Sequence, residues 1–316
     1  MTGPQSTVEP LLSVITVCLN RADTIAAALD SVARQLGAVP EGEIEHLVID
    51  GGSTDGTLVV AARFPDAHVV SEPDTGLYDA MNKGVALARG RYVCFLNSDD
   101  ELADGVLAAA RPYMLTGHDV ISAGTDFVRR NAANRHEVIE TIVAPDAIAL
   151  SPVNATLGSP LLNAKFFRRD FLRAVGQFDL RYKLASDVDL LLRAALNEPR
   201  QAVLPIVGHR YVEHAGSLTI NPSGNNGRRA ALECIAIADS TLEQPGLSRR
   251  TRGMLRAWRG GKRLMLALRD DRGLTTRLVS WVAVAANARD VGGYLSYLIR
   301  RKLAGPRGRQ FEPGVA

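Results

Sequence analysis

The residues best suited to chemistry in this sequence are an amide, a hydroxyl and two adjacent carboxylates, Asn97, Ser98, Asp99 and Asp100. They directly follow residues 92–96, whose apolar, aromatic and β-branched side chains predict a buried strand. Ligands of open α/β sheets bind at the carboxyl ends of strands, where carboxylate oxygens can hold a hard divalent cation. The sequence therefore predicts a site for a metal ion and a diphosphate. The alternative is that the two aspartates begin a turn or cap the next helix.

Three earlier segments show the same change from apolar to polar residues. Apolar stretches at 11–18, 45–49 and 68–70 each end in amide, acidic or turn-forming residues, and apolar residues at helical spacing follow them. This succession of strands and helices predicts a parallel sheet with helices on both faces. Because the carboxyl ends of parallel strands share one edge of a sheet, their polar residues should converge there.

The second of these strand ends carries a glycine-rich loop, residues 51–56. The loop lacks the G-x-G-x-x-G spacing of dinucleotide-binding proteins and the Gly-Lys-Ser/Thr ending of a P-loop. Its acidic side chains instead suit hydrogen bonds from a base or a ribose, with phosphates held by a cation.

Length and composition indicate a globular protein with one large domain and an appendage, because 46% of the 316 residues are hydrophobic. The three cysteines are far apart and show no zinc-ligand spacing, so we expect reduced core thiols in a cytosolic protein. The N-terminus has no basic segment followed by an apolar stretch, and we expect no secretory signal. The expected location is the cytoplasm.

The C-terminal part is strongly basic. Residues 246–316 carry a net charge of +12, which leaves −9 on the first 245 residues, and a linker from residue 221 leads into expected helices at 230–242, 252–268 and 276–302. The apolar stretch 278–288 is only 11 residues long and too short to span a bilayer. Aromatic and aliphatic residues beside cations at 294–302 suit an interfacial helix on an anionic membrane. The alternative is that these helices pack on their own domain or on a second subunit, as a homodimer.

Four segments together resemble the inverting family 2 glycosyltransferases with a GT-A fold: residues 13–21, 49–57, 76–84 and 95–100. More narrowly, Tyr-Asp-Ala-Met-Asn-Lys-Gly at 78–84 and Asn-Ser-Asp-Asp at 97–100 are similar to the subgroup that builds bacterial capsular and colanic-acid-like surface polysaccharides. The resemblance covers roughly residues 11–220. It implies a mostly parallel, Rossmann-like sheet flanked by helices over residues 1–220, with a basic helical C-terminal extension over 221–316.

The resemblance also implies roles for particular residues. Asp99 would be the direct ligand of Mg²⁺ or Mn²⁺ in a motif whose first acid is replaced by Asn97, and His214 is a further candidate metal ligand. The alternative to metal binding is that His214, as a lone histidine after a strand, makes only local hydrogen bonds. The positions implied for binding the nucleotide and the donor sugar are Asn20, Asp50, Ser53, Asp55, Asp79, Asn82, Asn97, Ser98 and Asp100.

The catalytic base implied by the resemblance is Asp187, which precedes an expected amphipathic helix, with Ser186 where many relatives have Glu. From the residue type alone, Asp187 is also a suitable helix N-cap. A helix N-terminus stabilises a carboxylate and weakens it as a base, whereas a dry pocket has the opposite effect. Asp189 and Arg193 are four residues apart and suited to pair along the helix. We further expect a β-hairpin within residues 119–143, on the acceptor side.

These features predict a metal-dependent inverting glycosyltransferase of the hexosyltransferase type. It would move a sugar from a UDP- or GDP-sugar to a hydroxyl of a glycan or lipid-linked acceptor, in cell-surface polysaccharide or glycolipid synthesis, at the inner face of the membrane if the basic extension binds lipid. A sugar-nucleotide nucleotidyltransferase is an alternative, but residues 20–23 are not its usual glycine-rich basic loop. A catalytically silent nucleotide-sugar-binding protein is another, suggested by Asn97 and Ser186. Nucleic-acid binding is not expected, since no reader motif accompanies the basic residues.

Overall fold

The computed structural model describes residues 9–130, 136–159, 161–213, 226–268, 281–282, 284–303 and 309–310. Its first part consists of four parallel strands, and a helix follows each of the first three. The succession of apolar segments and helical spacing in the sequence predicts this order. The strands lie in the order β4–β1–β2–β3 and all neighbours in this group are parallel. The elements are β1 (Leu12–Cys18), α1 (Ile25–Leu36), β2 (Ile44–Asp50), α2 (Thr57–Ala61), β3 (Ala67–Ser71), α3 (Leu77–Leu87) and β4 (Tyr92–Asn97).

The second part extends the same sheet in mixed orientation. Strand β8 pairs antiparallel with both β4 and β6, and β9 runs parallel to β6. The expected hairpin is confirmed, because β6 and β7 pair antiparallel. The elements are β5 (Glu101–Leu102), α4 (Val106–Leu115), β6 (Val120–Arg130), β7 (His136–Ile142), α5 (Pro145–Ile148), α6 (Pro152–Thr156), β8 (Lys165–Arg168), α7 (Arg169–Val175), α8 (Ser186–Leu196), β9 (Gln201–Glu213) and β10 (Arg309–Gln310).

The sheet has a hydrophobic core on each face because successive side chains of a strand point to opposite sides. In β1, Ile15 and Val17 contribute to the core beneath α3 and α8, whereas Leu12 and Val14 contribute to the core beneath α1 and α4. Helices on both faces of a mostly parallel sheet confirm the predicted fold class.

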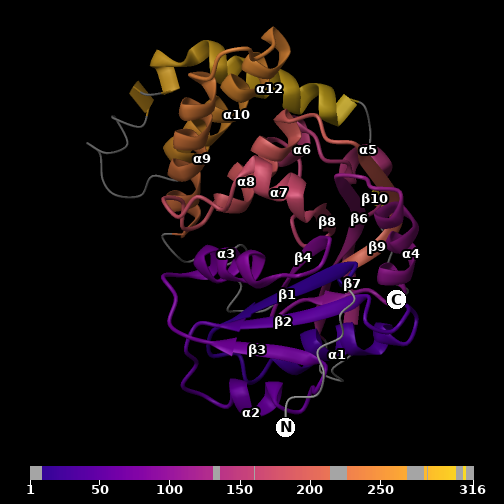
Figure 1. Ribbon diagram of the computed structural model, residues 1–316. Helices are drawn as coiled ribbons and strands as arrows, with labels where there is room; N and C mark the ends of the chain where they lie inside the picture. Colours follow the sequence, from indigo (N-terminus) through magenta and orange to yellow (C-terminus); the bar gives the residue numbers. More distant parts are fainter. Residues whose placement is uncertain are drawn as a thin grey trace, which may run out of the picture.

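The C-terminal helices α9 (Asn226–Leu242), α10 (Arg249–Leu268) and α12 (Ala288–Leu303) lie at one end of the molecule, above α6, α7 and α8 in Figure 1. Ile237 of α9 and Trp258 of α10 belong to the same core as Leu190 of α8. Arg259 of α10 joins the three helices by ion pairs of 2.5 Å to Asp239 of α9 and to Asp290 of α12. Helices α9 and α10 therefore pack on the sheet domain, which is one of the two arrangements expected for the extension.

Among the described helices, none is both long and apolar enough to cross a bilayer. The three cysteines are free and buried, as expected for core thiols.

Candidate active site

The carboxyl ends of β1 to β4 meet at one edge of the sheet, as predicted. Asp50 at the end of β2 lies opposite Cys18 in β1 and Ser71 in β3, and Asn97 at the end of β4 lies opposite Val17 in β1. The parallel register thus brings together polar residues that are up to 47 positions apart in the sequence, from Asp50 to Asn97.

Asp50 is fully buried beneath the glycine-rich loop. Its carboxylate accepts hydrogen bonds from the Ser53 amide (2.9 Å), the Ser71 hydroxyl (2.6 Å), the Gly52 amide (3.2 Å) and the Ser53 hydroxyl. Burial by itself raises the pKa of Asp50, but these hydrogen bonds outweigh it and hold the pKa below its ordinary value. Asp50 is therefore an ionised anchor that shapes the loop.

Asn20 and Asp55 are exposed and fasten the loop after β1 to the loop after β2. Asn20 has a left-handed backbone (φ 52°), donates its amide to the Ser53 hydroxyl (2.7 Å) and accepts from the Thr54 amide (2.9 Å). Asp55 accepts from the amides of Ala22 (3.1 Å) and Thr57 (2.8 Å). Hydrogen bonds thus join the two loops through four residues that were predicted to bind the nucleotide: Asn20, Asp50, Ser53 and Asp55.

At the end of β4, Asp100 is buried and its carboxylate faces the protein. It accepts from the side-chain amides of Asn97 (3.1 Å) and Asn163 (3.2 Å) and from the backbone of Val212 (3.1 Å). The His209 Nε2 atom also lies 3.2 Å from it. These contacts place Asp100 as a buried support for the side chain of Asn97.

The Oδ1 atom at the other end of the Asn97 side-chain amide is buried and has no hydrogen-bond partner among the described residues. Ser98 is buried as well, and Asp99 is partly exposed. An amide oxygen and a carboxylate are oxygen ligands of the kind that Mg²⁺ and Mn²⁺ take. Within the described part of the chain, no group of three or more His, Cys, Asp or Glu residues could enclose a metal by itself. Oxygens from a phosphate or water could join Asn97 and Asp99 around a cation, as is common for Mg²⁺.

His214 lies outside the described residues. Val212, two residues before it at the end of β9, bonds to Asp100 and so brings this strand to the end of β4.

Asp187 lies in the first turn of α8, and its Oδ1 atom accepts a hydrogen bond of 2.9 Å from the hydroxyl of Tyr78 in α3. The Tyr78 ring stacks on Phe178 (centroids 5.4 Å apart), which meets Phe95 edge to face (5.2 Å). Desolvation by burial raises the pKa of Asp187, although the Tyr78 hydrogen bond partly opposes this. A carboxylate with a raised pKa is a stronger base.

Tyr78 was not among the residues predicted for the site. It stands in the Tyr-Asp-Ala-Met-Asn-Lys-Gly segment, and that segment is the signal by which it could have been found. Burial and the nearby charge of Asp187 raise its own pKa well above the ordinary value, so the phenol stays a hydrogen-bond donor.

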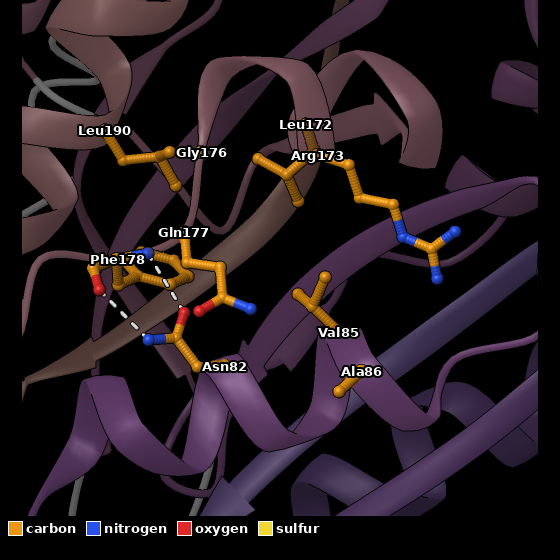
Figure 2. A pocket seen from close by; sticks show the side chains of 9 residues that line it. All are labelled: Asn82, Val85, Ala86, Leu172, Arg173, Gly176, Gln177, Phe178 and Leu190. Atoms are coloured by element: carbon orange, nitrogen blue, oxygen red, sulfur yellow. Dashed lines mark hydrogen bonds between the residues drawn. The ribbon is translucent and has the colours of Figure 1, made fainter.

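Asp79 and Asn82, from the same segment, make contacts within the protein. Asp79 accepts from the amide (2.8 Å) and hydroxyl (3.1 Å) of Thr75 at the start of α3. Figure 2 shows Asn82 bonded at both ends of its amide to the backbone of Phe178, at 3.0 Å each. Asn82 lines a small pocket, open to solvent, between α3, α7 and α8, and no carboxylate is among the described residues that line it. Asn82 therefore holds the ring that supports Tyr78.

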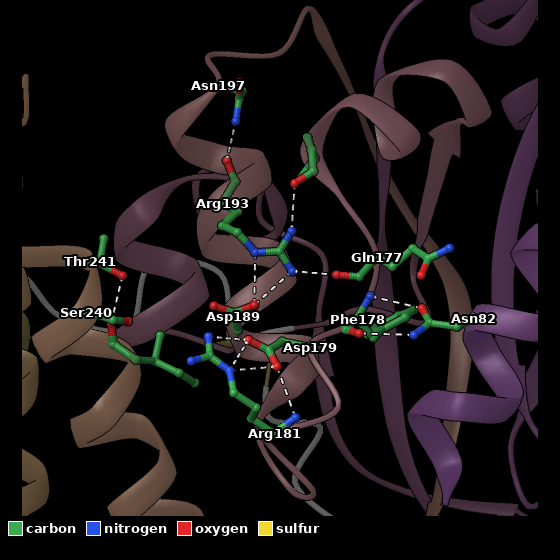
Figure 3. A network of polar contacts seen from close by, with 12 residues as sticks. Asn82, Gln177, Phe178, Asp179, Arg181, Asp189, Arg193, Asn197, Ser240 and Thr241 are labelled. Atoms are coloured by element: carbon green, nitrogen blue, oxygen red, sulfur yellow. Dashed lines mark hydrogen bonds and ion pairs between the residues drawn. The ribbon is translucent and has the colours of Figure 1, made fainter. Parts of the chain in front are cut away.

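The predicted ion pair between Asp189 and Arg193 is confirmed, with 2.9 Å between Arg193 Nε and the carboxylate. The same guanidinium also donates to the carbonyl of Val175 (2.7 Å). Figure 3 shows that it donates to the carbonyl of Gln177 as well (2.8 Å). Helix α8 is thus tied to the loop that carries Phe178.

Residues 13–176 match the family model described as Glycosyl transferase family 2. The chain belongs to this glycosyltransferase family. The glycosyltransferase is 33% identical over 202 residues to a "PGL/p-HBAD biosynthesis glycosyltransferase" of Mycobacterium tuberculosis, covering 60% of this chain and 71% of the relative. It is 28% identical over 198 residues to "Glycosyltransferase AglE" of Haloferax volcanii, covering 58% of this chain and 61% of the relative.

Solved structures share the fold of this glycosyltransferase at low sequence identity. The crystal structure of S. aureus TarS 1–349 in complex with UDP-GlcNAc has a TM-score of 0.67 at 20% identity, over 89% of this chain and 81% of that one. The mannosyltransferase PcManGT from Pyrobaculum calidifontis, in complex with GDP-Man and Mn²⁺, has a TM-score of 0.55 at 18% identity, over 94% and 89%. The expected GT-A fold is confirmed.

Proposed function

We propose that this glycosyltransferase is a metal-assisted inverting enzyme that moves a sugar from a nucleoside-diphosphate donor to a hydroxyl group. The proposal depends on the environment of Asp187. A hydrogen bond from Tyr78 holds its carboxylate in place, and burial raises its pKa. Fold neighbours support the donor class, because TarS was solved with UDP-GlcNAc and PcManGT with GDP-Man and Mn²⁺.

The reaction is a single displacement. Asp187 accepts the proton of the acceptor hydroxyl, whose oxygen forms a bond to the anomeric carbon from the face opposite the nucleotide. The bond from that carbon to the diphosphate oxygen breaks, and the diphosphate leaves with the electron pair. One displacement inverts the anomeric centre, so no second nucleophilic carboxylate is needed.

The donor would lie along the strand ends. The loops joined by Asn20, Ser53 and Asp55 would bind the base and ribose, on the anchor that Asp50 provides. Asn97, through its unpartnered oxygen, and Asp99 would hold a divalent cation that neutralises charge on the departing diphosphate. His214 is proposed as a further ligand of this cation. Four further residues would stabilise the protein around the donor pocket in this arrangement: Asp79, Asn82, Ser98 and Asp100.

For the acceptor we propose a glycan or lipid-linked hydroxyl compound, used at the inner face of a membrane. Support for a biosynthetic role comes from relatives named for PGL/p-HBAD biosynthesis. Helix α12 exposes Leu295 and Leu298 in a basic region, and this combination suits an anionic lipid surface. Contact with a second subunit through the same helix is the competing arrangement.

The test of the proposed function is Asp187→Asn. Candidate donors are first ranked by thermal shift of the wild type with Mn²⁺, since a ligand that binds the native state raises its apparent stability. With the best donor, the variant should lose transfer or donor hydrolysis by roughly 10²- to 10⁴-fold. Its affinity for UDP or GDP should stay within about twofold, because the nucleotide loops are untouched. Full activity in Asp187→Asn would refute the assignment of the base.

A further inference from the structure

Helix α8, which carries Asp187, lacks a cap from its own sequence. The residue at its N-cap is Ala185, which makes no side-chain cap hydrogen bond, and the third helical position is Val188 rather than the Glu or Gln of a capping box. The hydroxyl of Ser186 is buried and has no hydrogen-bond partner. The Asp187 carboxylate accepts from the backbone amides of Asp187 and Val188, whereas the N-cap residue contributes no side-chain acceptor.

Glu233 of α9 supplies the missing acceptor from 48 residues beyond Ala185. Its Oε2 atom accepts from the amides of Leu184 (2.8 Å) and Ala185 (2.9 Å), and its Oε1 atom accepts from the amide of Lys183 (3.1 Å). A negative charge at this end also complements the helix dipole. One carboxylate therefore holds three consecutive amides that lead into the turn with Asp187.

The position of Glu233 is set by the packing of α9. Its neighbour Cys234 is buried, and Ile237 and Ala238 are buried on the same side in the core that contains Leu190 of α8. A helix held by such a core cannot shift along its neighbour without losing close packing. The distance from Glu233 to the backbone of residues 183–185 is thus as rigid as the core itself.

We propose that Glu233 is a positioning residue for Asp187. Helix α9 of the C-terminal extension then contributes to the geometry of the active site. Glu233 fixes the start of α8 from one side and Tyr78 fixes the carboxylate from the other. The charge of Glu233 also raises the pKa of Asp187, in the same direction as burial. The proposal rests on the proposed role of Asp187 as the base.

The first experiment needs no substrate. Hydrogen exchange measured by mass spectrometry over residues 183–190 compares the wild type with Glu233→Ala, Glu233→Gln and the control Asp239→Asn. Asp239 lies on the same helix but bonds Arg259 of α10, so its variant perturbs α9 without touching α8. Exchange at 183–185 should speed up at least tenfold in Glu233→Ala, less in Glu233→Gln, which keeps one acceptor oxygen, and not in Asp239→Asn. Equal exchange in Glu233→Ala and the wild type would refute the capping role.

The second experiment measures kcat and KM with the donor found by thermal shift. A misplacement of about 1 Å costs roughly 10²-fold in rate, so kcat should fall 10- to 100-fold in Glu233→Ala while the donor KM stays within about twofold. Glu233→Gln should recover part of the rate, and Asp239→Asn should retain it. Equal losses in Glu233→Ala and Asp239→Asn would overturn the proposal in favour of general packing.

A double variant separates failure of this inference from failure of the proposed function. If Glu233 acts through Asp187, Glu233→Ala should add little loss in an Asp187→Asn background, because coupled residues are not additive. An additional loss equal to that of the single variant would show that Glu233 acts elsewhere. Wild-type activity in Asp187→Asn alone would instead refute the base, independently of Glu233.

Discussion

The hydroxyl of Tyr78 in α3 donates a hydrogen bond of 2.9 Å to the carboxylate of Asp187 in α8, 109 residues later in the chain. This bond lowers the pKa of Asp187, although burial keeps the net pKa above its ordinary value. Two helices on the same face of the sheet thereby meet at one proton-accepting group. Tyr78 fixes the direction of that group and lowers its pKa, while burial raises the pKa.

Tyr78→Phe tests this relationship while keeping the ring that stacks on Phe178. Loss of the donor removes the interaction that lowers the pKa of Asp187, so the acidic limb of the kcat profile should move to higher pH. At neutral pH, kcat should fall about tenfold, the order expected for a lost hydrogen bond to a charged group. Tyr92→Phe is the matched control, because the Tyr92 hydroxyl bonds the distant carbonyl of His118 (2.6 Å). An unchanged profile in Tyr78→Phe would contradict the assigned role.

Asp187→Asn should raise stability while it removes activity. The pKa of Asp187 is raised in the folded state, so ionisation of this group costs folding stability as pH rises through the ordinary pKa of an aspartate. At pH 7 the variant should therefore unfold at a higher temperature than the wild type. The gain should vanish at pH values where the wild-type carboxyl is protonated in both states. Thermal unfolding across pH checks this, and a lower Tm at pH 7 would be the opposite result.

Asp99→Asn should weaken the binding of the divalent ion. Replacing a carboxylate with a neutral amide beside Asn97 should raise the Mn²⁺ concentration for half-maximal activity by about 10- to 100-fold, since hard cations favour charged oxygen ligands. Asp104→Asn is the control, because Asp104 is five residues away, exposed and paired only loosely with Arg34 (3.4 Å). The measurement is a Mn²⁺ titration of donor hydrolysis after chelation with EDTA. Identical titrations for the wild type and Asp99→Asn would exclude Asp99 as a ligand.

Leu295→Glu combined with Leu298→Glu tests membrane contact through α12. These side chains are 45% and 38% exposed, so acidic replacements should leave the fold intact. Sedimentation with anionic vesicles should show at least a tenfold loss of binding, because buried apolar area and positive charge both contribute to interfacial binding. Val138→Glu, on an exposed position of β7 (55%), is the control. Equal vesicle binding by the wild type and the double variant would exclude this face of α12 as the membrane contact. A change in oligomeric state of the double variant would favour the dimer arrangement.

Local patterns in the sequence were sufficient to predict the order of strands and helices. They were also sufficient to predict the sheet edge at which the polar strand ends meet. Apolar runs followed by helical periodicity predict β1 to β4, and the parallel order then places Asp50 and Asn97 at the same edge. The pairing of Asp189 with Arg193 was predictable for the same reason, since it depends only on helical spacing. Such features are set by residues close together in the chain.

The contacts that surround the base were decided by tertiary packing. The sequence marks Asp187 through its resemblance to a family segment, but Tyr78 and Glu233 reach it or its helix only because α3 and α9 pack beside α8. Asp100 looks like an exposed ligand in the sequence and is buried by the approach of β9. These outcomes depend on which distant elements exclude water together, and no local spacing encodes that. Sequence alone therefore determined the edge of the sheet where the proposed donor site lies, and the tertiary structure decided which side chains hold the proposed base.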